Sequence, residues 1–137
     1  MVNELEKVHT SKVINLSTIK EYNFDNRYVG DNKGNVYLVK EKLNNHYLCI
    51  KLSPYETRGG YIEYVLTTKD GSKKHVQVHR VVAALFLPKV KGKDFVNHRD
   101  GDKNNNKSSN LQYMTHSENI KHTYDVLGRE PYRGKNK

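Results

Sequence analysis

The first half of the chain alternates apolar and polar residues in short runs that end at turn residues. Asn, Asp and Gly dominate residues 30–35 between two Tyr- and Val-rich runs, and Asp70-Gly71 separates another such pair. Alternation with Gly, Asn or Asp between the runs is typical of antiparallel β-hairpins. The pattern predicts a small antiparallel sheet, whereas residues 1–20 are mixed and predict no element. The predicted strands are residues 27–29, 36–39, 47–52, 61–67 and 75–78.

The second half changes to a helical spacing and then to the order strand, long loop, strand, helix. Apolar residues recur at helical spacing over residues 79–86, and Pro88 ends that segment. Thr115 and Glu118 fit a capping box that begins a last helix, for which Gly128 is a suitable end. The strands are predicted at residues 95–98 and 111–114, and the loop at 99–109 is rich in Asp, Asn, Gly and Ser.

The positive charge is concentrated in the second half. Residues 1–72 hold ten Lys/Arg and nine Asp/Glu, whereas residues 73–137 hold fourteen and six, so the net charges are +1 and +8. This asymmetry favours a polyanionic partner for the second half, with a merely solubilising basic surface as the alternative. A length of 137 residues with 35% hydrophobic residues allows one compact domain, alone or with a small lobe, and a modest core.

A single cysteine and the lack of long apolar runs limit the class of protein. Cys49 alone cannot form an intramolecular disulfide or a multi-cysteine zinc site, and its apolar neighbours predict that it is buried. No apolar stretch could span a bilayer, and residues 1–4 do not begin a signal peptide. We therefore expect a protein of the reducing cytoplasm with no membrane partner.

Residues 95–127 have a layout suited to cutting a phosphodiester bond. Hydrolysis needs an activated water and a cation on the phosphate oxygens. A neutral His can take the proton of the water near pH 7, and oxygen ligands hold Mg²⁺. A hairpin that carries His98 and packs on the following helix would assemble these parts.

The loop that begins at Asp100 is not an EF-hand, because Asn105 and Leu111 occupy the positions that require Gly and Glu.

Four motifs occur in this half in a fixed order. They are residues 78–86 (VHRVVAALF), 96–105 (VNHRDGDKNN), 109–115 (SNLQYMT) and 117–122 (SENIKH). Together they resemble the HNH endonucleases of phage introns and phage genomes. Residues 28–37 are similar, less specifically, to a strand module that often precedes the nuclease in homing enzymes. The resemblance implies an α+β fold, in which a small antiparallel β region and a helix precede a ββα-metal (His-Me finger) motif without structural zinc.

The resemblance also assigns roles to individual residues. His98 matches the general base, and Asn110 matches the central Asn that braces the loop and orients the His. Asn97 and Asn119 match the two positions that hold one Mg²⁺ or Mn²⁺ per site, and Asn119 is the final residue of the HNH signature. Because both expected ligands are neutral amides, we expect the metal to be recruited mainly when DNA phosphate is present.

Basic residues around these motifs are expected to contact double-stranded DNA, although a charge run is often only a solvated face. Arg99 is the strongest candidate for a phosphate contact because it follows His98 directly. His122 lies three residues after Asn119, where it either reaches the scissile phosphate or is a surface histidine. The expected DNA-binding residues are Arg99, Lys103, Lys107, Lys121 and His122.

The sequence thus predicts a metal-dependent endonuclease, homing-like and phage-encoded, that works in a bacterial host and nicks DNA with one site per chain. A non-catalytic DNA-binding regulator derived from a nuclease, or a nuclease adaptor in phage DNA packaging, is the alternative. Monomer and homodimer both stay open. We expect a β-rich DNA-contacting region at residues 1–72, a nuclease domain at 73–128 with its ββα core at 95–127, and a basic flexible tail at 129–137.

Overall fold

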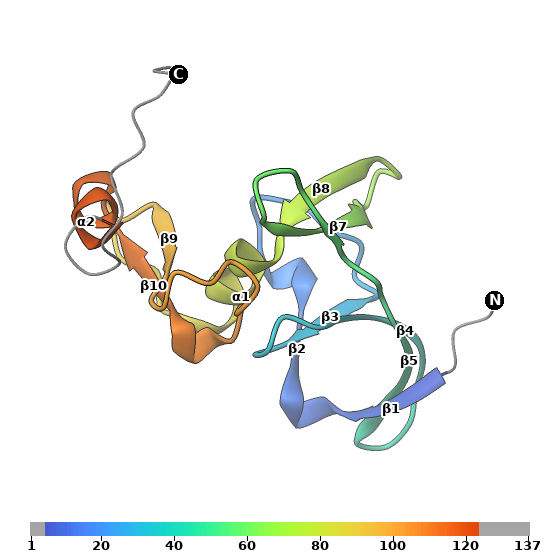
Figure 1. Cartoon of the computed structure of the whole chain (residues 1–137). Coiled ribbons are helices and arrows are strands. Elements are labelled where there is room, and N and C mark those ends of the chain that lie inside the picture. Colours follow the sequence, from blue (N-terminus) through green and yellow to red (C-terminus); the bar gives the residue numbers. More distant parts are fainter. Residues whose placement is uncertain (1–4, 124–137) are drawn as a thin grey trace.

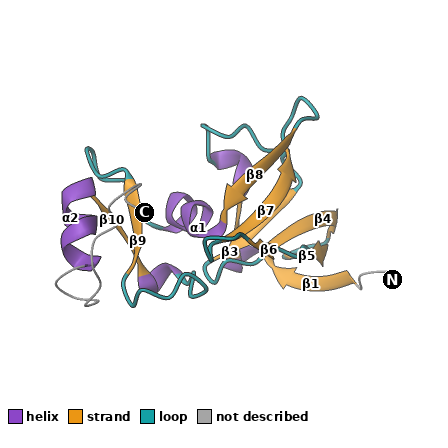
Figure 2. Ribbon diagram, turned by 45° about the horizontal axis from the view of Figure 1, so that its top comes forward, coloured by secondary structure: helices purple, strands orange, loops and turns teal. Residues whose placement is uncertain are grey.

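Three antiparallel sheets and two α-helices follow one another in the computed structural model, which describes residues 5–123. Helix α1 (Val78–Phe86) lies between the N-terminal sheets and a ββα unit at the opposite end, as Figures 1 and 2 both show. This arrangement confirms the predicted α+β class. Neither described helix has the length and apolar run that a bilayer crossing needs.

The largest sheet has five strands. In spatial order they are β1 (Leu5–His9), β5 (His46–Lys51), β4 (Val36–Lys42), β3 (Tyr28–Asp31) and β2 (Val13–Asn15). The predicted β3–β4 hairpin is confirmed, with Val29 opposite Tyr37. Its turn is fixed by the Asp31 carboxylate, which accepts the backbone N–H groups of Lys33 and Asn35 at 2.9 Å.

Strands β1 and β2 were not predicted. They add to the two edges of the sheet through backbone pairing, with Val8 opposite Tyr47 and Ile14 opposite Gly30. Both strands are short, and two 3₁₀ turns, η1 (Thr10–Lys12) and η2 (Leu16–Thr18), interrupt the segment that contains them. The alternation of apolar residues is therefore too irregular to indicate strands from the sequence.

A second sheet has three strands, β6 (Tyr55–Glu56), β7 (Ile62–Thr67) and β8 (Lys73–Gln77). The predicted turn at Asp70-Gly71 joins β7 to β8, and the N–H of Gly71 donates to the carbonyl of Thr68. Val78, expected at the end of a strand, is instead the first residue of α1. Because β8 pairs with β7, this sheet crosses the predicted boundary at residues 72 and 73, and the division into domains stays a prediction.

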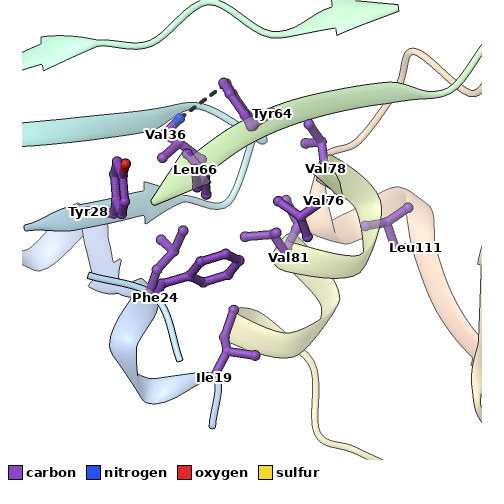
Figure 3. Close-up of a cluster of buried hydrophobic side chains, with 12 residues drawn as sticks. Ile19, Phe24, Tyr28, Val36, Tyr64, Leu66, Val76, Val78, Val81 and Leu111 are labelled. Atoms are coloured by element: carbon purple, nitrogen blue, oxygen red, sulfur yellow. Dashed lines mark hydrogen bonds between the residues drawn. The ribbon is translucent and has the colours of Figure 1, made fainter. Parts of the chain in front are cut away.

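One core joins the N-terminal sheets to the C-terminal unit. Figure 3 shows side chains of both sheets, of α1 and of β10 (Leu111–Met114) packed together. Leu111 is 1% exposed and belongs to this cluster, so the strand that follows the loop at residues 99–110 is anchored in it. The buried members are Leu16, Ile19, Phe24, Tyr28, Val36, Tyr64, Leu66, Val76, Val78, Val81, Val82 and Leu111.

A smaller cluster lies within the five-stranded sheet. It contains Cys49, which is fully buried and whose thiol donates to the carbonyl of Glu6 at 3.6 Å. Burial raises the pKa of this thiol. The expectation of a buried, hydrophobe-like cysteine is therefore confirmed. Val13, Val29 and Tyr37 are the other buried members.

The C-terminal unit has the predicted order. Strands β9 (Phe95–His98) and β10 form an antiparallel hairpin, and α2 (His116–Lys121) follows. The loop between the strands ends in a 3₁₀ turn, η3 (Ser108–Asn110). The expected continuation of the last helix beyond residue 123 and the predicted tail at 129–137 lie outside the described residues.

Candidate active site

Pairing of β9 with β10 fixes the position of His98. The register sets His98 opposite Leu111 and Asn97 opposite Gln112. Asn97 and His98 are 7% and 6% exposed, although they are polar residues at the end of a short strand. Buried polar side chains require partners, so these two residues mark the part of the hairpin where a site is built.

Asn97, His98 and Asn119 line one pocket of about 110 Å³. Asn97 and His98 belong to β9, whereas Asn119 is the fourth residue of α2 and lies 21 residues after His98 in the sequence. The pocket is also lined by Tyr61, Val96, Gly101, Lys103 and Thr123. The structure thus brings together three of the four residues that the motifs assign to catalysis and metal binding, and their roles stay predictions.

The ring of His98 is held through one nitrogen. Its Nε2 lies 2.7 Å from Oδ1 of Asn106, which is 6% exposed. Because an amide oxygen only accepts, Nε2 carries the proton of the neutral ring, and Nδ1 keeps its lone pair. Sequence reasoning missed Asn106. It is the last of three consecutive Asn residues, and only the path of the loop selects which of them reaches His98.

Asn110 lines no part of the pocket but braces the loop that leaves His98. Its carbonyl accepts the N–H of Arg99 at 2.7 Å, and its side-chain Nδ2 donates at 2.9 Å to Asp100 and to the carbonyl of Asn105. Bonds from Asn105, Asp102 and Asn110 lower the pKa of the Asp100 carboxyl to about 2. These contacts are the ones expected of a brace, which is the predicted role of Asn110.

Helix α2 begins at the predicted capping box. The Thr115 hydroxyl accepts the N–H of Glu118 at 3.1 Å, and the Glu118 carboxylate accepts the N–H of Thr115 at 2.9 Å. Lys93 also donates to Glu118 at 3.2 Å and connects the helix to the segment before β9. The cap therefore fixes the first turn of a short helix, and with it the position of Asn119.

The amide side chains of Asn97 and Asn119 in the pocket suit a hard divalent cation. Within residues 5–123, no group of three or more His, Cys, Asp or Glu side chains is arranged to hold a metal, and the pocket contains the amide side chains of Asn97 and Asn119. The Nδ2 atom of Asn97 is buried and has no hydrogen-bond partner among the described residues, and the side chain lines the pocket. Amide oxygens of Asn97 and Asn119 suit Mg²⁺ or Mn²⁺, provided that phosphate and water complete the shell.

Two further rings, those of His79 and Tyr61, pack next to His98. The ring of His79, in the first turn of α1, has its centroid 4.7 Å from that of His98, and Tyr61 stacks on His79 at 5.4 Å. Burial, with His98 and Arg80 nearby, lowers the pKa of His79 to about 3. His79 therefore packs in the first turn of α1 and stays neutral near pH 7. Tyr61 was not predicted at the site, because it lies 37 positions before His98 in a region assigned to the sheet.

The expected DNA-binding residues differ in their surroundings. Arg99, Lys107 and Lys121 are exposed and are not among the residues that line the pocket. Lys103 is half-buried, and its ammonium donates to the carbonyl of Gly59 at 2.8 Å. His122 is also half-buried, with a buried Nδ1 that has no hydrogen-bond partner among the described residues. Contact of any of these with DNA stays a prediction.

Comparison with known proteins agrees with the four motifs. Residues 76–121 match the model of the HNH endonuclease family. An uncharacterized HNH endonuclease of Acanthamoeba polyphaga mimivirus is 36% identical over 104 residues, which are 72% of this chain and 23% of that protein. The DNA endonuclease I-HmuI of Bacillus phage SP01 is 34% identical over 98 residues, 71% of this chain and 51% of that enzyme.

A solved structure shares the fold. It is a structure of DNA binding and cleavage by the HNH homing endonuclease I-HmuI, and it matches with a TM-score of 0.65 and 30% identity. The match covers 82% of this chain and 59% of that chain. The chain spans about a quarter of the length of the mimivirus relative and about half of the length of the phage enzyme.

Proposed function

We propose, on the premise that residues 76–121 are those of an HNH endonuclease, that this protein is a metal-dependent enzyme that hydrolyses phosphodiester bonds of double-stranded DNA. The observation that carries the proposal is the pocket in which His98 faces the amides of Asn97 and Asn119 while Asn106 holds its Nε2. A general base with one fixed nitrogen and a free lone pair is suited to activating a water.

In this mechanism His98 takes a proton from water at Nδ1. The water oxygen forms a bond to phosphorus, the bond from phosphorus to the 3′ oxygen breaks, and that oxygen takes a proton from solvent. Asn106 keeps the ring in the reactive tautomer and, through Oδ1, stabilises the positive charge that the ring acquires. Asn110 keeps the loop after His98 in place through its bonds to Arg99 and Asp100.

Asn97 and Asn119 are the residues that would hold the cation. Mg²⁺ or Mn²⁺ would supply positive charge for the phosphate oxygens and the leaving oxygen. Since both amides are neutral, DNA phosphate contributes the negative charge that a stable complex requires. One candidate active site among the described residues implies one cut strand per binding event, so a double-strand break would require two chains or two successive events.

The relatives support a phage- or virus-encoded enzyme of the homing type that acts in the cytoplasm of its host. One of them comes from a Bacillus phage and another from a mimivirus. The exposed residues Arg99, Lys107 and Lys121 would contact the DNA backbone, together with His122 and with Lys103, which lines the pocket.

Cleavage of supercoiled plasmid tests this function. Wild-type protein should produce the nicked circle with Mn²⁺ or Mg²⁺, and His98→Ala should lose that activity while it binds duplex DNA with unchanged affinity. His75→Ala, which removes an exposed histidine of β8, is the matched control and should cut normally. Equal cutting by His98→Ala would contradict the assignment of the base. Binding by the wild type without cleavage under Mg²⁺, Mn²⁺ or Zn²⁺ would favour a DNA-binding regulator.

A further inference from the structure

The turn between β6 and β7 reaches the candidate active site from the N-terminal sheets. The N–H of Thr57 donates to the carbonyl of Tyr61 at 2.8 Å, and the N–H of Gly60 donates to the carbonyl of Thr57 at 2.9 Å. Gly60 has a φ of +88°, a left-handed conformation that closes the turn and that glycine adopts without strain. The backbone around Tyr61 is therefore fixed, and its side chain starts from a defined position.

The rings of Tyr61, His79 and His98 form one group. Its ring stacks on His79 with an interplanar angle of 27°, and His79 packs in turn against His98. The centroids of Tyr61 and His98 are 6.4 Å apart, and both residues line the pocket that contains Asn97 and Asn119. Tyr61 is thus packed directly on His79 and, through it, against the ring of His98.

Lys103, in the loop that follows His98, contacts this turn at two points. Its ammonium lies 4.5 Å from the centroid of the Tyr61 ring, in addition to its hydrogen bond with the carbonyl of Gly59. A cation over an aromatic face and a charge-assisted hydrogen bond both hold the ring against the loop. A residue of the N-terminal sheets and a residue of the loop after His98 are therefore in direct contact.

We propose that Tyr61 is a positioning residue for His98, because its ring, held by Lys103, keeps the His79 and His98 rings in the orientation that leaves Nδ1 of His98 directed at the reacting water. The proposal rests on the proposed nuclease function. It assigns part of the active site to residues 59–61, in a region that the sequence assigns only to DNA contact. Removal of the ring frees His98 to rotate, and misplaced catalytic groups lose rate steeply with distance.

Three variants separate positioning from other roles. Tyr61→Ala should lower kcat for plasmid nicking by about 10- to 100-fold with a KM for DNA within about two-fold of wild type. Tyr61→Phe keeps the ring and should cut at the wild-type rate. Tyr55→Ala, which removes an exposed tyrosine from the neighbouring strand of the same sheet, is the matched control and should leave kcat unchanged.

A measurement without DNA or metal checks the same inference independently of activity. The side-chain nitrogens of His98, assigned by comparison with His98→Gln, should report a single tautomer with the proton on Nε2 in the wild type and in Tyr61→Phe. In Tyr61→Ala the rings of His79 and His98 have room to turn, so the Nε2 hydrogen bond to Asn106 should form only part of the time, and averaged nitrogen shifts are expected. Thermal unfolding of each variant establishes that the comparison is made between folded proteins.

Four outcomes would overturn the proposal. They are an unchanged kcat with an unchanged spectrum in Tyr61→Ala, an equal loss in Tyr61→Phe, a raised KM at constant kcat, and an equal loss in Tyr55→Ala. The second would assign the effect to the hydroxyl group, and the third would assign it to DNA contact. If the wild type cuts no DNA, the proposed function fails, while the nitrogen spectra still decide whether Tyr61 positions His98.

Discussion

At the residue scale, two neighbouring side chains, Asn106 and His79, hold the ring of His98. Oδ1 of Asn106 accepts a hydrogen bond from Nε2 of His98 at 2.7 Å, and the centroid of the His79 ring lies 4.7 Å from that of His98. A hydrogen bond sets the tautomer, and a packed ring sets the orientation. In the proposed mechanism, the reactivity of His98 therefore depends on Asn106 and His79 as well as on His98 itself.

Removal of the Asn106 acceptor should impair the base without weakening DNA binding. Asn106→Ala leaves Nε2 of His98 buried without a partner, so the tautomer with the proton on Nδ1 becomes populated and kcat should fall by about 10- to 100-fold. Single-turnover cleavage and binding of duplex DNA measure the two effects. Asn104→Ala, in the same run of asparagines but exposed, is the control. A similar loss in both variants would mean that the loop as a whole, and not the acceptor, determines the rate.

The buried His79 should make the protein less stable in mild acid. Its pKa is lowered from 6.5 to about 3, so between these values the unfolded chain binds a proton that the folded chain excludes. Stability therefore falls as the pH falls through this window, by about 2 kcal/mol between pH 7 and pH 5. In urea unfolding, His79→Phe should remove this part of the pH dependence, whereas the exposed His75→Gln should keep it. Identical pH profiles for His79→Phe and wild type would contradict the prediction.

At the element scale, the strand, loop, strand and helix that carry the site follow from local sequence signals. The β9–β10 pairing and the Thr115 cap depend on residues close together in the sequence, and they were predicted. The approach of Tyr61 to His98 depends on the packing of separate sheets, for which no local pattern exists. The choice of Asn106 depends on the turn in which the N–H of Asn105 donates to the carbonyl of Asp102, and three consecutive asparagines give no signal of it.

Loss of the helix cap should loosen the element that presents Asn119. Thr115→Ala removes the hydroxyl that accepts the N–H of Glu118, which should cost about 1 kcal/mol of stability. We expect faster hydrogen exchange at residues 118–121 and a lower kcat, because α2 has only six residues and little intrinsic helical stability. Ser117→Ala, at an exposed position of the same helix, is the control. Unchanged exchange in Thr115→Ala would show that packing alone holds the helix.

At the scale of the whole molecule, the N-terminal sheets and the C-terminal unit meet around the active-site loop. The carbonyl of Asn32, in the β3–β4 turn, accepts the N–H of Ser108 at 2.8 Å. In the same turn, a Cβ on Gly34 would lie 3.4 Å from Cβ of Asn106 and only 2.9 Å from Val78. The turn between β6 and β7 reaches Lys103. Two turns of the N-terminal region therefore support the loop that contains Asn106, so this region shapes the site in addition to any contact that it makes with DNA.

The charge distribution predicts how DNA binding responds to salt. Residues 73–137 carry a net charge of +8 against +1 for residues 1–72, so phosphate contacts should come mainly from the second half. Arg99 and Lys107 are exposed in the loop beside the pocket. In titrations of a non-specific duplex over a range of salt concentrations, Arg99→Gln and Lys107→Gln should each reduce the slope of log K against log salt by about 1.

The matched control for this charge change is on the opposite end of the molecule. Lys7 is exposed on β1, which Figures 1 and 2 show far from α2, so Lys7→Gln should leave the slope unchanged. Like the loop variants, it removes one positive charge, and any effect of net charge alone would be the same in all three proteins. An equal loss of slope in Lys7→Gln would therefore contradict the assignment of the DNA path to the second half. Loss confined to the loop variants would instead locate the duplex over His98, where the proposed cleavage requires it.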